Sequence, residues 1–232
     1  KLRKIKKGKN MYNRDYLSNQ SSQYTQESSK VQLMSFLKAT YQLFAGSLLA
    51  ATAGAYIGLG IVSLLMGPVK WVLFAIELAL IFFVIPRVKH TPGLNLAVLF
   101  AFTFITGLTI APLLASIFAM PSGASIVGQA FLMTSVAFGA ISMFAMTTKR
   151  DFSSMGKFLF IALIIMIVAG ISNIFIQSSM MQLAIASVGA LLFSAFILYD
   201  TQNIIKGNYD SPIEAALSLY LVYLAGEAEK LN

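Results

Sequence analysis

The sequence predicts an all-α membrane protein, a polytopic bundle of helices that cross a bilayer. Hydrophobic residues make up 57% of the 232 residues and charged residues only 11%. The mean hydropathy of +0.76 is well above that of a soluble globular domain. The apolar residues gather in runs close to the ~20 residues that a helix needs to cross a bilayer. The chain has no cysteine and one histidine, which excludes disulfides, cysteine-ligated metals and clusters of histidine ligands.

Six apolar runs are long enough to span a membrane, so we expect six full transmembrane helices. Their expected bounds are Phe36–Leu59, Val69–Ile85, Leu94–Phe118, Ala124–Met146, Phe158–Ile176 and Met181–Ile205. A seventh run, Ile213–Ala225, is too short to span and is expected to be a truncated seventh helix, re-entrant or interfacial. The bundle is therefore expected to occupy residues 31–225, with a tail at 226–232.

Residues 1–30 are polar and basic, and they contain too few apolar side chains to fold alone. We expect them to form a disordered tail. Met11 follows a Lys/Gly-rich stretch whose codons can read as a ribosome-binding sequence. Residues 1–10 are therefore expected to lie ahead of the native start, in what is normally an untranslated leader.

Basic residues gather in alternate connections between the expected helices. They are Arg87 and Lys89 after the second helix, Lys149, Arg150 and Lys157 after the fourth, and Lys206 after the sixth. Because Lys and Arg stay on the cytoplasmic side during insertion, the N-terminus is expected to be cytoplasmic. The net charge of +8 then reflects membrane topology. We expect no nucleic-acid binding, since no basic face lies on a soluble module.

Small residues recur in the first helix, at Gly46, Gly54, Gly58 and Gly60. Such residues let helix backbones approach closely, so they indicate tight helix packing. A cavity lined by backbone is the alternative interpretation.

Two acids lie within the apolar helices, Glu77 in the second and Asp200 near the cytoplasmic end of the sixth. A charge in this position costs roughly 2.5–3.5 kcal/mol on insertion scales, which makes both residues candidate proton- or cation-sensing groups. The structural alternatives are a hydrogen-bonded acid within the bundle for Glu77 and an interfacial, water-facing acid for Asp200. Glu77 has no polar neighbour in sequence, so a partner must come from another helix.

Asp200 has several candidate partners. Asn203 lies three residues on, so it shares a helix face with Asp200 and adds a polar group there. Arg87 or Lys89 is a candidate salt-bridge partner that would keep the carboxylate ionised. No nucleophile–base pair and no phosphate loop is present, so we expect no enzymatic activity.

Three motifs carry a resemblance to a known family. They are "GLTIAPLLAS" (107–116), "FILYDTQNIIKG" (196–207) and "SPIEAALSLYL" (211–221). In this order they resemble the Bax inhibitor-1 family, also called the transmembrane BAX inhibitor motif family, and in particular its bacterial branch. The resemblance covers roughly residues 30–221. It implies a bacterial inner-membrane protein in which six helices surround a central seventh.

The resemblance also implies a pH-sensitive calcium leak. In the family, an acid at the position of Asp200 pairs with a second Asp on the last helix, while an acid matched by Glu77 and a base matched by Arg87 are also implicated. Coupled carboxylates of this kind share a proton and suit Ca²⁺. Ca²⁺ is accordingly expected as a bound or permeant ion, with Asp200 as its candidate ligand. No other cofactor is expected.

This chain departs from the family at Val222, where the second Asp would stand. The motif agreement stops there, as a frameshift or chain end would produce, so half of the acid pair is missing. A second interpretation is therefore kept. Some bacterial relatives are associated with an FtsH-type ATP-dependent membrane protease, and the N-terminal tail suits a non-transporting regulator of such a protease.

Overall fold

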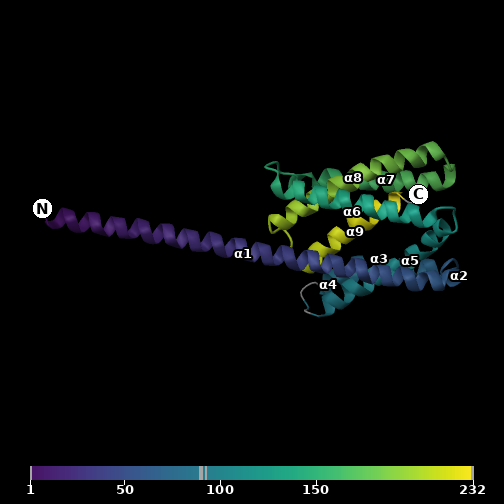
Figure 1. The fold of residues 1–232 in the computed structure, drawn as a ribbon, viewed down its shortest axis with the longest axis horizontal. Helices are drawn as coiled ribbons and strands as arrows, with labels where there is room; N and C mark the ends of the chain where they lie inside the picture. The colour runs from purple at the N-terminus through teal and green to yellow at the C-terminus, as the bar shows by residue number, and fades with distance from the viewer. Residues whose placement is uncertain (1, 89–90, 92, 231–232) are drawn as a thin grey trace. The chain divides into compact units, whose positions relative to one another are not determined.

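The computed structural model describes residues 2–88, 91 and 93–230, and these residues form helices joined by short connections (Figure 1). The helices are α1 (Leu2–Gly60), α2 (Val62–Leu65), α3 (Val69–Ala79), the π-helix η1 (Leu80–Val84), α4 (Ile85–Val88), α5 (Leu94–Phe118), α6 (Gly123–Thr147), the 3₁₀-helix η2 (Ser153–Met155), α7 (Gly156–Ile176), α8 (Ser179–Ile205) and α9 (Pro212–Lys230). No strand occurs among the described residues. The expected all-α fold is confirmed.

Six helical spans are long and apolar enough to cross a membrane in the described part of the chain. They are Glu27–Gly60, Val69–Val88, Leu94–Phe118, Gly123–Thr147, Ser153–Asn173 and Ser179–Ile205. Each contains most of a run that the sequence predicts, so the prediction of six transmembrane helices is confirmed. The second span consists of α3, η1 and α4 in succession. Its π-turn ends two residues before Pro86, which lacks an N–H to donate to the turn before it.

The chain divides into two units, residues 1–39 and residues 40–232. The first unit lies wholly within α1, which includes the segment 2–30 where composition predicts a disordered tail. A polar segment of this kind forms at best a marginal helix in water. Its disorder in solution and the leader at residues 1–10 stay predictions.

In the second unit, α1 and α5 pack so closely that only glycine fits at the contact. A Cβ atom on Gly54 would lie 2.1 Å from the carbonyl oxygen of Phe104, and one on Gly107 would lie 2.0 Å from that of Ala51. A Cβ on Gly58 would meet the Cβ of Ala111 at 2.5 Å. The predicted tight packing through small residues is therefore confirmed at Gly54 and Gly58.

The glycines at the two ends of this series differ. A Cβ on Gly46 would lie 3.1 Å from the ring of Phe100, which is a closer contact than most real Cβ atoms make. A Cβ on Gly60 would have no described neighbour within 4 Å. Tight packing therefore extends to Gly46 and does not reach Gly60.

The seventh apolar segment lies inside the bundle, which corrects the expectation of an interfacial piece. α9 packs against α5, α6 and α8, and Ala215, Leu219 and Tyr220 are fully buried. The helix extends over 19 residues, although its apolar part is only Pro212–Tyr223. The reason is that α9 offers small and aromatic side chains to its neighbours on several faces, so burial in the bundle is more favourable than a place at the membrane surface. This position matches the central seventh helix that the resemblance implies.

The outward faces of the bundle are apolar. Large side chains with at least two thirds of their surface exposed include Trp71, Phe82, Phe175, Met180 and Leu191. A soluble protein does not expose apolar surface on this scale. These faces therefore contact lipid, as the membrane fold requires.

Candidate functional site: a buried carboxylate held by two hydroxyls

Asp200 lies near the C-terminal end of α8, with only 3% of its surface exposed. The hydroxyl of Tyr209, in the loop after α8, donates to Oδ1 at 2.8 Å, and the hydroxyl of Ser218 on α9 donates to Oδ2 at 2.8 Å. The Tyr209 hydroxyl also lies 3.1 Å from Ser218 Oγ. The three side chains form a closed triangle, which we call the Asp200 triangle. Burial excludes the alternative that Asp200 faces open water.

The Asp200 triangle lies beside a groove of about 470 Å³ between α7, α8 and α9. The groove is lined by Leu163, Phe193, Phe196, Tyr199, Asp200, Tyr209, Ser218, Leu221 and Val222. Val222 therefore borders the same space as Asp200, although it contributes no oxygen atom. The position where the resemblance places a second acid is thus beside Asp200 and is apolar in this chain.

The side-chain oxygen atoms of the triangle do not by themselves complete the coordination shell of a calcium ion. One carboxylate and two hydroxyls provide at most four oxygens, whereas Ca²⁺ takes six to eight. Within the described residues, no group of three or more His, Cys, Asp or Glu side chains comes together. Ligands beyond these three side chains would be needed to form a calcium-binding cage, so Asp200 as a calcium ligand stays a prediction.

Glu77 forms a separate site on α3. Thr109 on α5 donates to Glu77 Oε1 at 2.9 Å, and the Glu77 side chain is buried. The expectation that its partner comes from another helix is confirmed. Among the described contacts, α3 packs against α2, η1 and α5, and α8 packs against α6, α7, η2 and α9. The structure therefore does not bring Glu77 and Asp200 into one site.

The candidate partners of Asp200 lie elsewhere. Arg87 is exposed and donates to the carbonyl oxygen of Phe83 in its own span, and no ion pair joins it to Asp200. Lys89 lies outside the described residues. Asn203 is buried but donates to the Tyr199 carbonyl oxygen at 3.0 Å, and it accepts from the Asn208 side chain at 2.7 Å. Asn203 therefore closes the end of α8 and makes no described hydrogen bond to Asp200.

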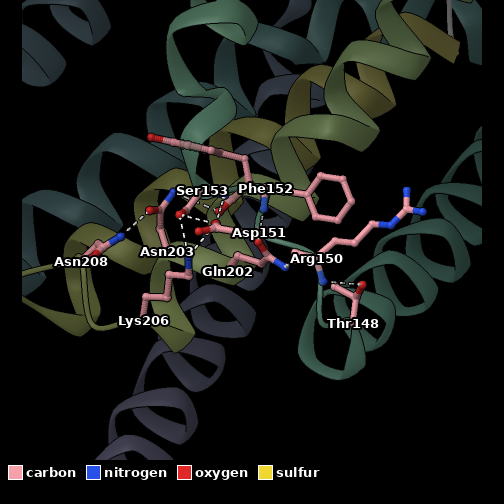
Figure 2. A network of polar contacts seen from close by, with 10 residues as sticks. Thr148, Arg150, Asp151, Phe152, Ser153, Gln202, Asn203, Lys206 and Asn208 are labelled. Carbon is pink, nitrogen blue, oxygen red and sulfur yellow. Dashed lines mark hydrogen bonds and ion pairs between the residues drawn. The ribbon is translucent and has the colours of Figure 1, made fainter.

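The end of α8 is also fastened to the connection between α6 and α7, as Figure 2 shows. The buried Gln202 side chain accepts from the backbone N–H of Phe152 at 2.6 Å and donates to the carbonyl oxygen of Arg150 at 2.7 Å. One turn further along, Lys206 pairs with Asp151 and donates to Ser153 Oγ at 2.9 Å. These contacts, which we call the α8 clamp, join two of the basic connections at one end of the bundle.

Two groups outside the membrane-spanning segments have shifted pKa values. Hydrogen bonds from Lys206 and Ser153 lower the pKa of Asp151 to about 2. Burial raises the pKa of Tyr209, and the nearby carboxylate of Asp200 raises it further. Tyr209 therefore remains a protonated hydrogen-bond donor to Asp200 at any ordinary pH.

Sequence reasoning missed Tyr209, Ser218 and Gln202. Tyr209 lies in a polar loop, where a lone tyrosine has no periodic signal. Ser218 stands four residues before Val222 in the "SLYLV" segment, and a lone serine in an apolar helix predicts no particular partner. Gln202 lies in a short polar stretch, between Thr201 and Asn203, at the end of an apolar run. The available signal is the glutamine itself. When it is buried at the end of an apolar helix, both its carbonyl oxygen and its NH₂ group need hydrogen-bond partners from another segment.

The comparisons with known proteins agree with the motifs. A family model described as "Inhibitor of apoptosis-promoting Bax1" matches residues 33–225. The chain belongs to the Bax inhibitor-1 family. It is 50% identical over 217 residues to a Campylobacter jejuni protein, with 92% of each chain covered. It is also 38% identical over 203 residues to a Vibrio cholerae "uncharacterized membrane protein", covering 87% of this chain and 86% of that one.

The similarity extends to eukaryotes. Mouse "protein lifeguard 4" is 33% identical over 193 residues, covering 81% of this chain and 79% of the mouse protein. The Bax inhibitor-1 match includes α9 as far as Ala225, so it includes Val222 as well. The second motif carries Asp200 on α8 and the third carries Ser218 on α9, whereas the first lies on α5, which packs against α9 and carries Thr109, the partner of Glu77.

Proposed function

We propose that this Bax inhibitor-1 protein is a pH-sensitive cation leak, with Asp200 as its proton-sensing group. The observation that carries the proposal is a carboxylate buried in a membrane helix and held by two neutral hydroxyls, with no cationic partner among the described residues. Intramembrane acids are costly and persist mainly where they serve an ion or proton path. The family membership supports the same function.

Protonation of Asp200 would rearrange the Asp200 triangle. Both carboxylate oxygens accept a hydrogen bond, one from Tyr209 and one from Ser218. A protonated carboxyl has an O–H to donate on one oxygen, so one of these two hydrogen bonds would reverse, with the hydroxyl oxygen accepting from the carboxyl group. Because Tyr209 belongs to the loop and Ser218 to α9, the change would alter how α9 is held against α8.

Calcium is proposed as a permeant ion. An ion in transit needs contacts weak enough to release it, and a single carboxylate with two hydroxyls meets that need. Glu77 is a second proton- or cation-sensing acid in this proposal, held by Thr109 on its own side of the bundle. The family motif implies a pair of acids. Because Val222 stands at the position of the second acid, Asp200 is the one member of that pair in this chain.

The test is calcium flux into liposomes that contain the purified full chain, measured at about pH 6 and about pH 8. Wild type is compared with Asp200→Asn and Glu77→Gln, and Asp151→Asn provides an exposed acid at the same end of the bundle as the matched control. We expect pH-dependent flux in wild type and Asp151→Asn. We expect flux that no longer responds to pH in Asp200→Asn. Equal pH responses in wild type and Asp200→Asn would exclude Asp200 as the sensor.

The protein is proposed to lie in a bacterial inner membrane with a cytoplasmic N-terminus. The similarity to bacterial membrane proteins supports the location. The α8 clamp supports the orientation, since it joins the connection that carries Lys149 and Arg150 to the one that carries Lys206, and basic connections stay in the cytoplasm. Lys149 and Ser122 lie on connections at opposite ends of α6. Cysteines that replace them one at a time should react with a membrane-impermeant thiol reagent from opposite sides of an inverted membrane vesicle.

A non-transporting regulator of an FtsH-type protease is the second candidate. The observation in its favour is that residues 1–39, which include the polar N-terminal segment, form a unit of their own that such a protease could grip. Removal of residues 11–30 should then prolong the lifetime of the protein in cells that contain the protease. A lifetime unchanged by this deletion, together with calcium flux in liposomes, would favour the leak alone.

A further inference from the structure

Four buried hydroxyls, one of them on Tyr41, have no hydrogen-bond partner among the described residues. The other three lie on α1 and α6 around one contact. They belong to Thr40 and Ser47, both fully buried on α1, and to Thr134, which is 5% exposed on α6. Buried polar groups in proteins are almost always paired, either with protein atoms or with ordered water. Three exceptions along one contact therefore need a common explanation.

These hydroxyls also forgo the partner that every helical Ser or Thr has within reach. Elsewhere in the same bundle, Thr52, Thr106 and Ser187 each donate to the carbonyl oxygen four residues earlier, at 2.8 Å. That bond is the usual solution for a hydroxyl in an apolar helix. Among the described residues, the hydroxyls of Thr40, Ser47 and Thr134 make no such bond, although all three side chains are buried.

The three hydroxyls surround one aromatic contact. Phe44 on α1 stacks on Phe138 on α6, with ring centroids 5.0 Å apart. Consecutive spans alternate in direction, so the part of α1 in the second unit and α6 are antiparallel, as Figure 1 shows. Ser47 lies three residues after Phe44, and Thr134 lies four residues before Phe138. Both therefore lie about one helical turn from the stacked rings, on the same side.

The opposite side of the rings has the same character. Thr40 lies four residues before Phe44 on α1, and Ser142 lies four residues after Phe138 on α6. Ser142 Oγ is 3.4 Å from the hydroxyl of Thr201, the neighbour of Asp200 in sequence. Tyr223 of α9 closes the aromatic layer, with ring centroids 5.8 Å from Phe44 and 6.0 Å from Phe138. Hydroxyls thus border the aromatic layer both toward Asp200 and away from it.

We propose that α1 and α6 enclose ordered water, held by Ser47 and Thr134 on one side of the Phe44–Phe138 stack and by Thr40 on the other. A buried water needs two to four polar partners. A hydroxyl can both donate to water and accept from it, and helix carbonyl oxygens have a second lone pair to offer. The water sites do not depend on ion flux, so they are predicted whether or not the protein conducts calcium.

The experiment uses brief X-ray irradiation of the wild-type protein in liposomes, which converts water molecules into hydroxyl radicals where they lie. A radical formed beside the stack adds oxygen to the nearest ring, and mass spectrometry of peptides reports the added mass. We expect oxidation of Phe44 and Phe138 about tenfold faster than that of Phe82 and Phe160, which face lipid. Rates at Phe44 and Phe138 no higher than at these two controls would overturn the proposal.

A second arm removes the hydroxyls and keeps the shape. In the double variant Ser47→Ala/Thr134→Val, oxidation of Phe44 and Phe138 should fall about fivefold. Thr52→Val on the lipid-facing side of α1 is the matched control and should leave both rates unchanged. An unchanged rate in a double variant that retains its thermal unfolding transition would show that water reaches the rings without these hydroxyls, and so would contradict their role.

Discussion

The hydroxyl of Tyr209, in the loop after α8, donates a 2.8 Å hydrogen bond to Oδ1 of Asp200, nine residues earlier in the chain. This bond ties a loop to a carboxylate that is buried in a membrane helix. The same hydroxyl lies within 3.1 Å of Ser218, so one phenol connects α8, the loop and α9. The stability of α9 in the bundle should therefore depend on this single oxygen atom.

Tyr209→Phe removes that oxygen and leaves Asp200 Oδ1 without a described donor. A hydrogen bond to a charged group contributes about 2 kcal/mol, so the free energy of unfolding should fall by about that amount. Denaturant unfolding in detergent, followed by circular dichroism, measures the change.

Tyr199→Phe is the control for this prediction. Tyr199 lines the same groove, but its hydroxyl makes no hydrogen bond that the structure describes. Its free energy of unfolding should change by less than about 0.5 kcal/mol. Equal losses in the two variants would show that the effect of Tyr209→Phe does not come from Asp200.

Thr109→Val tests the second acid. It removes the donor to Glu77 Oε1 and should lower the free energy of unfolding by about 1 kcal/mol. In a Glu77→Leu background there is no carboxylate for Thr109 to bond, so Thr109→Val should change the free energy of unfolding very little. A double-mutant cycle measures the coupling. Equal effects in both backgrounds would mean that the bond contributes nothing to stability.

Gln202→Leu tests the α8 clamp. It deprives the Phe152 N–H and the Arg150 carbonyl oxygen of their shared partner, and it should destabilise the protein by about 2 kcal/mol. Hydrogen exchange at the Phe152 amide should become faster by at least about tenfold. Lys206→Met breaks the neighbouring ion pair and keeps both Gln202 bonds, so it should leave that amide protected. Exchange at Phe152 that is unaffected by Gln202→Leu would rule out the clamp.

The ion pair of Asp151 with Lys206 predicts a dependence on acid pH. Folding lowers the pKa of Asp151 from 3.8 to about 2, so the charged form favours the folded state. This stabilisation is complete above the unfolded value and is lost as the pH falls through the interval from 3.8 to about 2. The difference in unfolding free energy between wild type and Asp151→Asn should therefore be constant above about pH 5. It should shrink as the pH falls through this interval. A difference that persists unchanged at pH 2 would contradict the assignment.

The fold could be predicted from sequence to a large extent, because the apolar runs have the length of the bilayer and the basic residues lie in the connections. The spans at Leu94–Phe118 and Ser179–Ile205 agree with the sequence to within two residues. The place of α9 could not be predicted by its length. A helix is buried by what its neighbours offer, and the close fit of Tyr220 and Tyr223 among aromatic side chains of α5 and α6 is not visible in the segment itself.

Of the candidate site, the two acids could be predicted from the sequence, and their hydrogen-bond partners could not. Glu77 and Asp200 are identified by the cost of a charge in lipid, which needs no knowledge of the fold. Their partners Thr109 and Ser218 come from other helices, at 32 and 18 residues' separation. Only the packing of the helices determines which hydroxyl meets which acid. Charge alone predicts Arg87 as a partner of Asp200, yet Arg87 lies on a span that does not contact α8 among the described residues.

The most direct test of the central claim, that Asp200 exchanges a proton, is an infrared difference spectrum of the full chain in liposomes between acid and neutral pH. We predict a band of a protonated carboxyl group in the acid state of wild type, shifted in frequency by Tyr209→Phe and absent in Asp200→Asn. If Asp200→Asn shows the same set of carboxyl bands as wild type, Asp200 does not titrate and the proposed sensor is wrong.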